Sequence, residues 1–106
     1  MLCFSFISCK KMIISDIKGQ IWLDGTFCDW KDAGIHVLSH TLHYGTGVFE
    51  GVRAYESENG TAIFRLDDHT ERLFQSAKLI GMKIPYSVQQ LMDAQCESVK
   101  KNQLKN

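Results

Sequence analysis

The dipeptide Asp24-Gly25 constrains the fold of this chain more than any other feature of the sequence. It stands between two short runs of β-forming residues. A two-residue type I′ turn needs positive φ at both central positions, which Asp tolerates and Gly favours. The sequence therefore predicts a β-hairpin with these cross-strand pairs: Leu23 with Thr26, Trp22 with Phe27, and Ile21 with Cys28.

A second hairpin is predicted from the alternating residues 48–55, a turn at 58–60 and a strand over 61–65. Alternation places successive side chains on opposite faces. One face then carries Val48, Glu50, Val52 and Ala54, and the other carries Phe49, Gly51, Arg53 and Tyr55. We expect this hairpin to extend the first one into a single antiparallel sheet.

Three helices are predicted. A short one over residues 40–44 follows Ser39 as N-cap and ends at Gly45. A longer one begins at Asp67 or Asp68, with Glu71 completing a capping box, and ends before Gly81. The last follows Ser87, with Gln90 three residues on. The expected fold class is α+β, an antiparallel sheet of hairpins with two helices packed on it.

Length and charge narrow the possible functions. The 106 residues allow one domain, and twelve basic residues balance twelve acidic ones, which argues against a nucleic-acid partner. No apolar run is long enough to span a bilayer, so no membrane partner is expected. The first residues, 1–12, differ in character from the rest of the chain and are interpreted as a disordered or mis-assigned extension, with Met12 as the natural start and 13–106 as the domain.

The four cysteines show no metal-binding or redox spacing. Cys3, Cys9, Cys28 and Cys96 form no CxxC pair, and the first residues lack the basic region of a signal peptide. We therefore expect reduced thiols in a cytoplasmic protein.

Chemistry-bearing residues are densest between Ser39 and Arg53. The face with Phe49, Gly51 and Arg53 joins an aromatic wall, a gap and a cation, which suits a small ligand with an apolar part and a carboxylate. A tightly packed strand with a surface arginine explains the pattern equally well. His40 and His43 have no third ligand at a helical interval, so packing and capping are favoured over metal binding. A relay of Ser39, His43 and Asp32 stays open but lacks a supporting motif. By pattern alone, Arg72 is an ion-pair partner of Asp68.

Three stretches of the sequence are informative together: Trp22-Leu-Asp-Gly25, Val37-Leu-Ser-His-Thr-Leu-His-Tyr-Gly-Thr-Gly-Val-Phe-Glu-Gly-Val-Arg53 and Phe64-Arg-Leu-Asp-Asp-His-Thr-Glu-Arg-Leu73. They resemble the start of branched-chain amino acid aminotransferases, which are class IV (fold type IV) pyridoxal-phosphate enzymes. The resemblance runs from about Gln20 to Asn102. It implies transfer of an amino group from leucine, isoleucine or valine to 2-oxoglutarate, with pyridoxal 5′-phosphate as cofactor and a homo-oligomeric assembly.

The resemblance also assigns roles to individual residues. Arg72 matches the arginine that holds the cofactor phosphate. Tyr44 and Phe49 match aromatic residues of the pocket for the branched side chain, while Gly51 and Arg53 match positions that help recognise the substrate carboxylate. No catalytic residue is expected among the nine lysines here, because the family's Schiff-base lysine lies in the second domain.

The resemblance therefore predicts the N-terminal domain of such an enzyme, with the second domain absent and no activity for this chain alone. Two alternatives remain. One is a non-catalytic module that binds a small ligand or a protein. The other is a different class IV member, such as a D-amino acid aminotransferase or an aminodeoxychorismate lyase.

Overall fold

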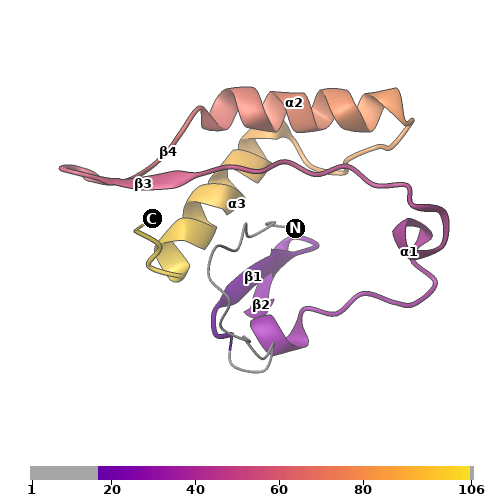
Figure 1. The fold of residues 1–106 in the computed structure, drawn as a ribbon, viewed down its shortest axis with the longest axis horizontal. Helices are drawn as coiled ribbons and strands as arrows, with labels where there is room; N and C mark the ends of the chain where they lie inside the picture. The colour runs from indigo at the N-terminus through magenta and orange to yellow at the C-terminus, as the bar shows by residue number, and fades with distance from the viewer. Residues whose placement is uncertain (1–16, 106) are drawn as a thin grey trace, which may run out of the picture.

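The computed structural model describes residues 17–105, so the interpretation of residues 1–12 lies outside the described part. Figure 1 shows the order of the elements along the chain. They are β1 (Gln20–Leu23), β2 (Thr26–Asp29), a 3₁₀ turn (Trp30–Asp32), α1 (His40–Tyr44), β3 (Ala54–Ser57), β4 (Gly60–Ile63), α2 (Leu66–Leu79) and α3 (Val88–Lys101). The α+β class expected from the sequence is confirmed.

The first hairpin forms as predicted. β1 pairs antiparallel with β2, and Leu23, Trp22 and Ile21 lie opposite Thr26, Phe27 and Cys28. Asp24 and Gly25 have φ of 46° and 90°, the positive values that a type I′ turn requires. The observed register is the one that a two-residue turn at these positions predicts.

The second hairpin is shorter than predicted and does not join the first. β3 pairs with β4, and Ala54 lies opposite Ile63. In the described residues the two hairpins make two separate two-stranded sheets, so the expectation of one continuous sheet is wrong. The end of α3 and the residues after it contact both hairpins: the Asn102 side chain bonds the backbone of Gln20, and Thr61 Oγ1 donates to Leu104 O at 2.9 Å.

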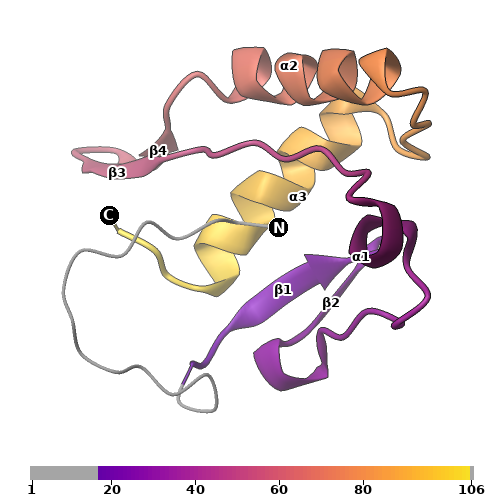
Figure 2. The ribbon, with the colours of Figure 1, turned by 45° about the vertical axis from the view of Figure 1, so that its right-hand side comes forward.

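Helix α3 lies between α2 and the β1–β2 hairpin, as Figures 1 and 2 show from two directions. Thr70 and Ala77 of α2 are the fully buried side chains of the described chain. Thr70 Oγ1 donates to Leu66 O at 2.8 Å and accepts from Gln95 Nε2 of α3 at 3.0 Å. On the other side, Trp22 of β1 packs edge-on against Tyr86, with ring centroids 5.0 Å apart.

The two long helices begin differently. Ser87 caps α3 and forms the predicted capping box with Gln90. The N-cap of α2 is Arg65, in the left-handed region at φ 49°, and not Asp67 or Asp68 as predicted. Because Asp68 Oδ2 accepts from Arg65 Nε at 2.6 Å, this carboxylate is engaged with a side chain and caps no backbone N–H. Ser39 precedes α1 as expected but makes no side-chain cap.

Many large apolar side chains are exposed. They are concentrated between residues 35 and 49, where Val37 and Leu38 are each 67% exposed and Phe49 is 70% exposed. Exposed apolar side chains that gather into a patch are typical of a site that meets another molecule or domain. Within residues 17–105, no helix has the length and apolar character to cross a bilayer.

Candidate functional site

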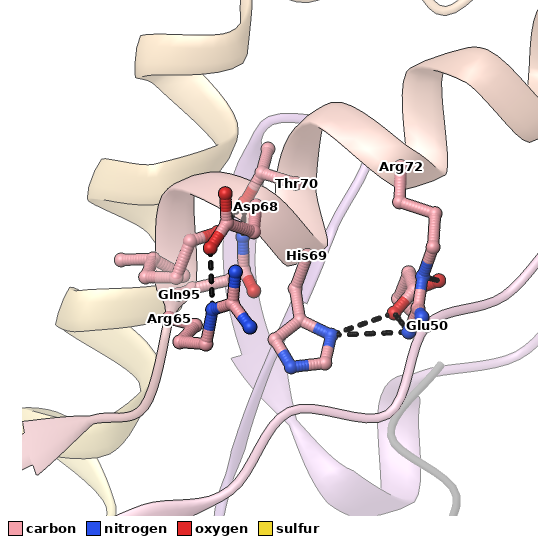
Figure 3. Close-up of polar contacts among 8 residues, drawn as sticks. Glu50, Arg65, Asp68, His69, Thr70, Arg72 and Gln95 are labelled. Atoms are coloured by element: carbon pink, nitrogen blue, oxygen red, sulfur yellow. Dashed lines mark hydrogen bonds and ion pairs between the residues drawn. The ribbon is translucent and has the colours of Figure 1, made fainter.

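An ion-pair cluster joins helix α2 to the extended segment that precedes β3. Arg72 Nε donates to Glu50 Oε1 and Arg72 Nη2 donates to Glu50 Oε2, each at 2.6 Å. Figure 3 shows the guanidinium and the carboxylate side by side, with His69 approaching the same carboxylate. Two parallel charge-assisted bonds fix orientation as well as distance. The ion pair of Arg72 with Asp68 that local spacing predicted is therefore wrong: Arg72 binds Glu50, and Asp68 binds Arg65.

His69 completes the cluster from the preceding turn of α2. Its Nδ1 lies 2.9 Å from Glu50 Oε2 and 3.2 Å from Arg72 Nη2. A carboxylate is acceptor-only and a guanidinium is donor-only, so the tautomer with hydrogen on Nδ1 satisfies the shorter contact. Residues three apart on a helix share a face, which brings His69 and Arg72 to one carboxylate.

The cluster strongly favours the ionised carboxylate. Hydrogen bonds from Arg72 and then from His69 lower the pKa of Glu50 from 4.5 to about 2, against an opposing effect of burial. The bond to Glu50 in turn raises the pKa of Arg72. Glu50 is only 12% exposed, whereas Arg72 is 61% exposed. The carboxylate is thus the enclosed member of the pair and the guanidinium reaches into solvent.

One edge of the Arg72 guanidinium is free of the carboxylate. Among the described residues, Nη1 donates no hydrogen bond, while Nε and Nη2 are held by Glu50. Arginine carries five N–H donors, and the Nη1–Nη2 end can bind a second anion in a bidentate way. The cluster can therefore receive an anion without releasing Glu50.

The segment from residue 48 to 53 keeps the predicted alternation but not the predicted strand. Val48, Glu50 and Val52 are half-buried, whereas Phe49, Gly51 and Arg53 are exposed. Within the described chain the backbone of 48–52 pairs with no strand, and Arg53 O accepts from Phe64 N at 2.9 Å, next to the first residue pair of β3 and β4. Alternation thus separates Glu50, which faces α2, from the three exposed residues predicted to meet a ligand.

Glu50 binds Arg72 to the inner face of residues 48–53, whereas Phe49, Gly51 and Arg53 lie on the exposed face. Within residues 17–105, no hydrogen bond, ion pair or ring contact joins Arg72 to Phe49, Gly51, Arg53 or Tyr44. A Cβ at Gly51 would meet nothing within 4 Å, and its φ lies outside the left-handed region. Neither backbone conformation nor packing in the described chain requires glycine there.

The residues of α1 are held by local contacts. His43 Nε2 lies 2.9 Å from Val37 O, and the rings of His40 and Tyr44 pack edge-on with centroids 5.6 Å apart. Tyr44 is 74% exposed. In the part of the chain that the structure describes, no three His, Cys, Asp or Glu side chains gather as a metal site.

A shallow groove of about 550 Å³ lies elsewhere, at the C-terminal end of α2 and the turn after it. Its lining includes Phe74, Ala77, Gly81 and Met82, and none of the residues predicted to bind cofactor or substrate.

Sequence reasoning missed Glu50 and His69 as partners of Arg72. Glu50 stands out as the carboxylate of the glycine-rich stretch, but nothing local connects it to a residue 22 positions later. The spacing of His69 and Arg72 on one helix face is the signal that could have indicated a shared partner.

Comparison with known proteins decides the family. Residues 47–106, which include Glu50, His69 and Arg72, match the family model described as amino-transferase class IV. The chain belongs to the class IV aminotransferase family. A branched-chain-amino-acid aminotransferase of Pseudomonas aeruginosa is 54% identical to this class IV chain over 95 residues, covering 90% of the chain and 31% of the relative. One from Escherichia coli K12 is 45% identical over 84 residues, covering 79% and 27%.

Solved class IV structures share the fold. A branched-chain amino acid aminotransferase from T.th., complexed with N-(5′-phosphopyridoxyl)-L-glutamate, superposes with a TM-score of 0.81 at 48% identity, over 83% of this chain and 30% of that one. The enzyme from Thermoproteus uzoniensis with norvaline gives 0.79 at 46% identity, over 84% and 30%. The chain thus spans about 30% of the length of the relatives it matches.

Proposed function

We propose that this sequence forms part of a pyridoxal 5′-phosphate-dependent branched-chain amino acid aminotransferase, which moves the amino group of leucine, isoleucine or valine to 2-oxoglutarate. Family membership and relatives named for this activity support the proposal. So does the relative that binds a phosphopyridoxyl-glutamate, a compound uniting the cofactor with the amino acid that forms from 2-oxoglutarate.

The observation that carries the proposal is the guanidinium of Arg72. It is exposed, its Nε–Nη2 edge is occupied by Glu50, and its Nη1 donates no bond among residues 17–105. A planar guanidinium end matches a phosphate better than the point charge of lysine does. These donors fit the phosphate end of the cofactor, so we assign Arg72 as the residue that holds it.

The remaining residues would act on the substrate. Phe49 and Tyr44 would supply apolar surface for the branched side chain, and Arg53 would pair with the carboxylate. Open space at Gly51 supports a close approach of ligand to the backbone. When bound, the cofactor supplies the electron sink for loss of the α-proton. We infer that the lysine that moves this proton lies outside these 106 residues.

The proposed enzyme assembles with further polypeptide and works in the cytoplasm. Exposed apolar residues between 35 and 49 support burial against further polypeptide, including a second copy in a homo-oligomer. Among residues 17–105, Cys28 and Cys96 are free thiols, which supports a reducing compartment such as the cytoplasm. The 13–106 domain boundary remains a prediction.

A chimera tests the activity. The matched residues of this chain would replace the corresponding 95 residues of the Pseudomonas aeruginosa relative. We expect the chimera to transaminate leucine with 2-oxoglutarate, and the 106-residue chain alone to be inactive. A folded chimera without leucine transamination would contradict the proposal, and one acting only on D-amino acids would favour a different class IV activity. Leucine transamination by the 106-residue chain would contradict the placement of the reactive lysine outside it.

A further inference from the structure

The side chain of an exposed arginine is mobile unless another group holds it. Arg72 stands on α2 with 61% of its side chain exposed, so its long stem alone does not set the direction of the guanidinium. A phosphate-binding arginine must point its donors at one place before the ligand arrives, because ordering them on binding lowers affinity.

We propose that Glu50 is a positioning residue: its carboxylate holds the Nε–Nη2 edge of Arg72 and thereby presents the Nη1–Nη2 end to the cofactor phosphate. This inference rests on the proposed function, in which Arg72 binds that phosphate.

The geometry of the pair supports positioning. Both Arg72 bonds to Glu50 measure 2.6 Å and run from two nitrogens to two oxygens. Such a fork-to-fork contact aligns the planes of the two groups and removes rotation about the end of the arginine stem. Of the five guanidinium N–H groups, two bind Glu50 and three remain, two of them on Nη1.

Glu50 is itself held in place. Its side chain is 12% exposed, and its Oε2 accepts from His69 Nδ1 at 2.9 Å as well as from Arg72. The carboxylate is therefore fixed by donors from two successive turns of α2. A fixed acceptor can orient a mobile donor, whereas a mobile one cannot.

Pairing with Glu50 reduces the electrostatic attraction of Arg72 for a phosphate. The charges of Arg72 and Glu50 cancel, so a phosphate gains orientation from the pair but little net attraction. If Glu50 only competed for the guanidinium, its neutralisation would strengthen phosphate binding. If Glu50 positions the guanidinium, neutralisation weakens phosphate binding. The two roles predict changes of opposite sign.

The test uses the full 106-residue chain with two probes, pyridoxamine 5′-phosphate and pyridoxamine. Neither probe can form a Schiff base with lysine, and they differ by the phosphate alone. NMR titration gives both dissociation constants, and their ratio measures the phosphate-dependent part of binding. The Nε–H resonance of Arg72 reports, without any ligand, whether the guanidinium is held.

We expect Glu50→Gln to lower this phosphate-dependent ratio by about tenfold, the lower end of the losses seen when groups that orient metal ligands are removed. The Arg72 Nε–H resonance should shift and exchange faster with solvent. Glu56→Gln is the matched control, because it neutralises an exposed carboxylate paired with Lys105 at 3.7 Å, away from the cluster. It should change neither readout.

Variants of His69 test whether its hydrogen bond holds Glu50 in place. His69→Asn retains an N–H donor near the position of Nδ1 and should keep most of the phosphate-dependent ratio. His69→Leu removes the donor and should lower the ratio in the same direction as Glu50→Gln. Equal losses for Asn and Leu would overturn the role of His69 in holding Glu50.

The outcomes separate the two proposals. If the wild-type chain binds pyridoxamine 5′-phosphate more tightly than pyridoxamine, and Arg72→Ala removes this difference, the assignment of Arg72 as the phosphate-binding residue is supported. An unchanged or increased ratio for Glu50→Gln then overturns positioning alone. If the wild-type chain does not discriminate, or Arg72→Ala leaves discrimination intact, the assignment of Arg72 fails and positioning by Glu50 fails with it.

Discussion

Asn102 joins the start of the first hairpin to the end of the last helix, and its removal should destabilise the chain measurably. Its Oδ1 accepts from Gln20 N at 2.7 Å, and its Nδ2 donates to Gln20 O at 2.9 Å. Each such bond contributes about 0.5–1.5 kcal/mol net. Asn102→Ala should therefore cost about 1–3 kcal/mol. The bond from Asn102 Nδ2 to Ser98 O adds little to this cost, because Ser98 O still accepts from Asn102 N after the substitution.

Urea unfolding of the full chain measures this cost. With a urea m-value of roughly 1–3 kcal/mol/M, the loss lowers the midpoint by about 1 M while leaving m unchanged. Gln103→Ala is the matched control, since its side chain is exposed and makes no hydrogen bond among the described residues. It should stay within about 0.5 kcal/mol of wild type.

A second substitution checks the geometry of the same contact. A Cβ at Gly19 would lie 2.6 Å from Asn102 Oδ1, and Gly19 has φ +150°. Gly19→Ala should thus cost less in the Asn102→Ala background, where the steric clash is gone. A cost below about 0.5 kcal/mol for Asn102→Ala, or purely additive costs for the pair, would refute the reasoning.

Three other predictions concern local features. Glu50 has its pKa lowered in the folded chain, so its ionised form stabilises the fold above pH 4.5; the stability difference between wild type and Glu50→Gln, measured by urea unfolding, should shrink as the pH falls from 4.5 to about 2. A difference that grows in acid would contradict this. Gly25→Ala should cost about 1–2 kcal/mol because φ is +90°, whereas Gly34→Ala, with open space around its Cβ, should cost much less; similar costs would exclude the turn. Ser87→Ala should cost about 1 kcal/mol through loss of the cap on α3, and unchanged thermal unfolding would exclude the cap.

The features predicted correctly from the sequence are those specified over a few residues. The Asp24-Gly25 turn predicts the register that β1 and β2 have in the structure. The capping box of Ser87 and Gln90 is likewise complete within four positions. Alternation along 48–53 also sorted these side chains correctly onto two faces, and the structure shows one face half-buried and the other exposed.

The features that were predicted wrongly depend on contacts far along the chain. A strand needs a partner at its edge, and residues 48–52 find none in the described chain. Local spacing paired Arg72 with Asp68, but Arg65 takes Asp68 and leaves Arg72 to Glu50. Helix α2 begins earlier than predicted, with Arg65 and not Asp67 or Asp68 as its N-cap, and Asp68 binds the Arg65 side chain and not the backbone. The roles of Phe49, Gly51 and Arg53 remain predictions, because their spacing on one face does not show which ligand binds that face.

The most direct test of the central claim is a crystal structure of the chimera with pyridoxamine 5′-phosphate bound. The account predicts the Nη1–Nη2 end of Arg72 at about 2.7–2.9 Å from phosphate oxygens, with both bonds from Arg72 to Glu50 retained. A phosphate bound by other groups, with the guanidinium of Arg72 turned away from it, would contradict the account.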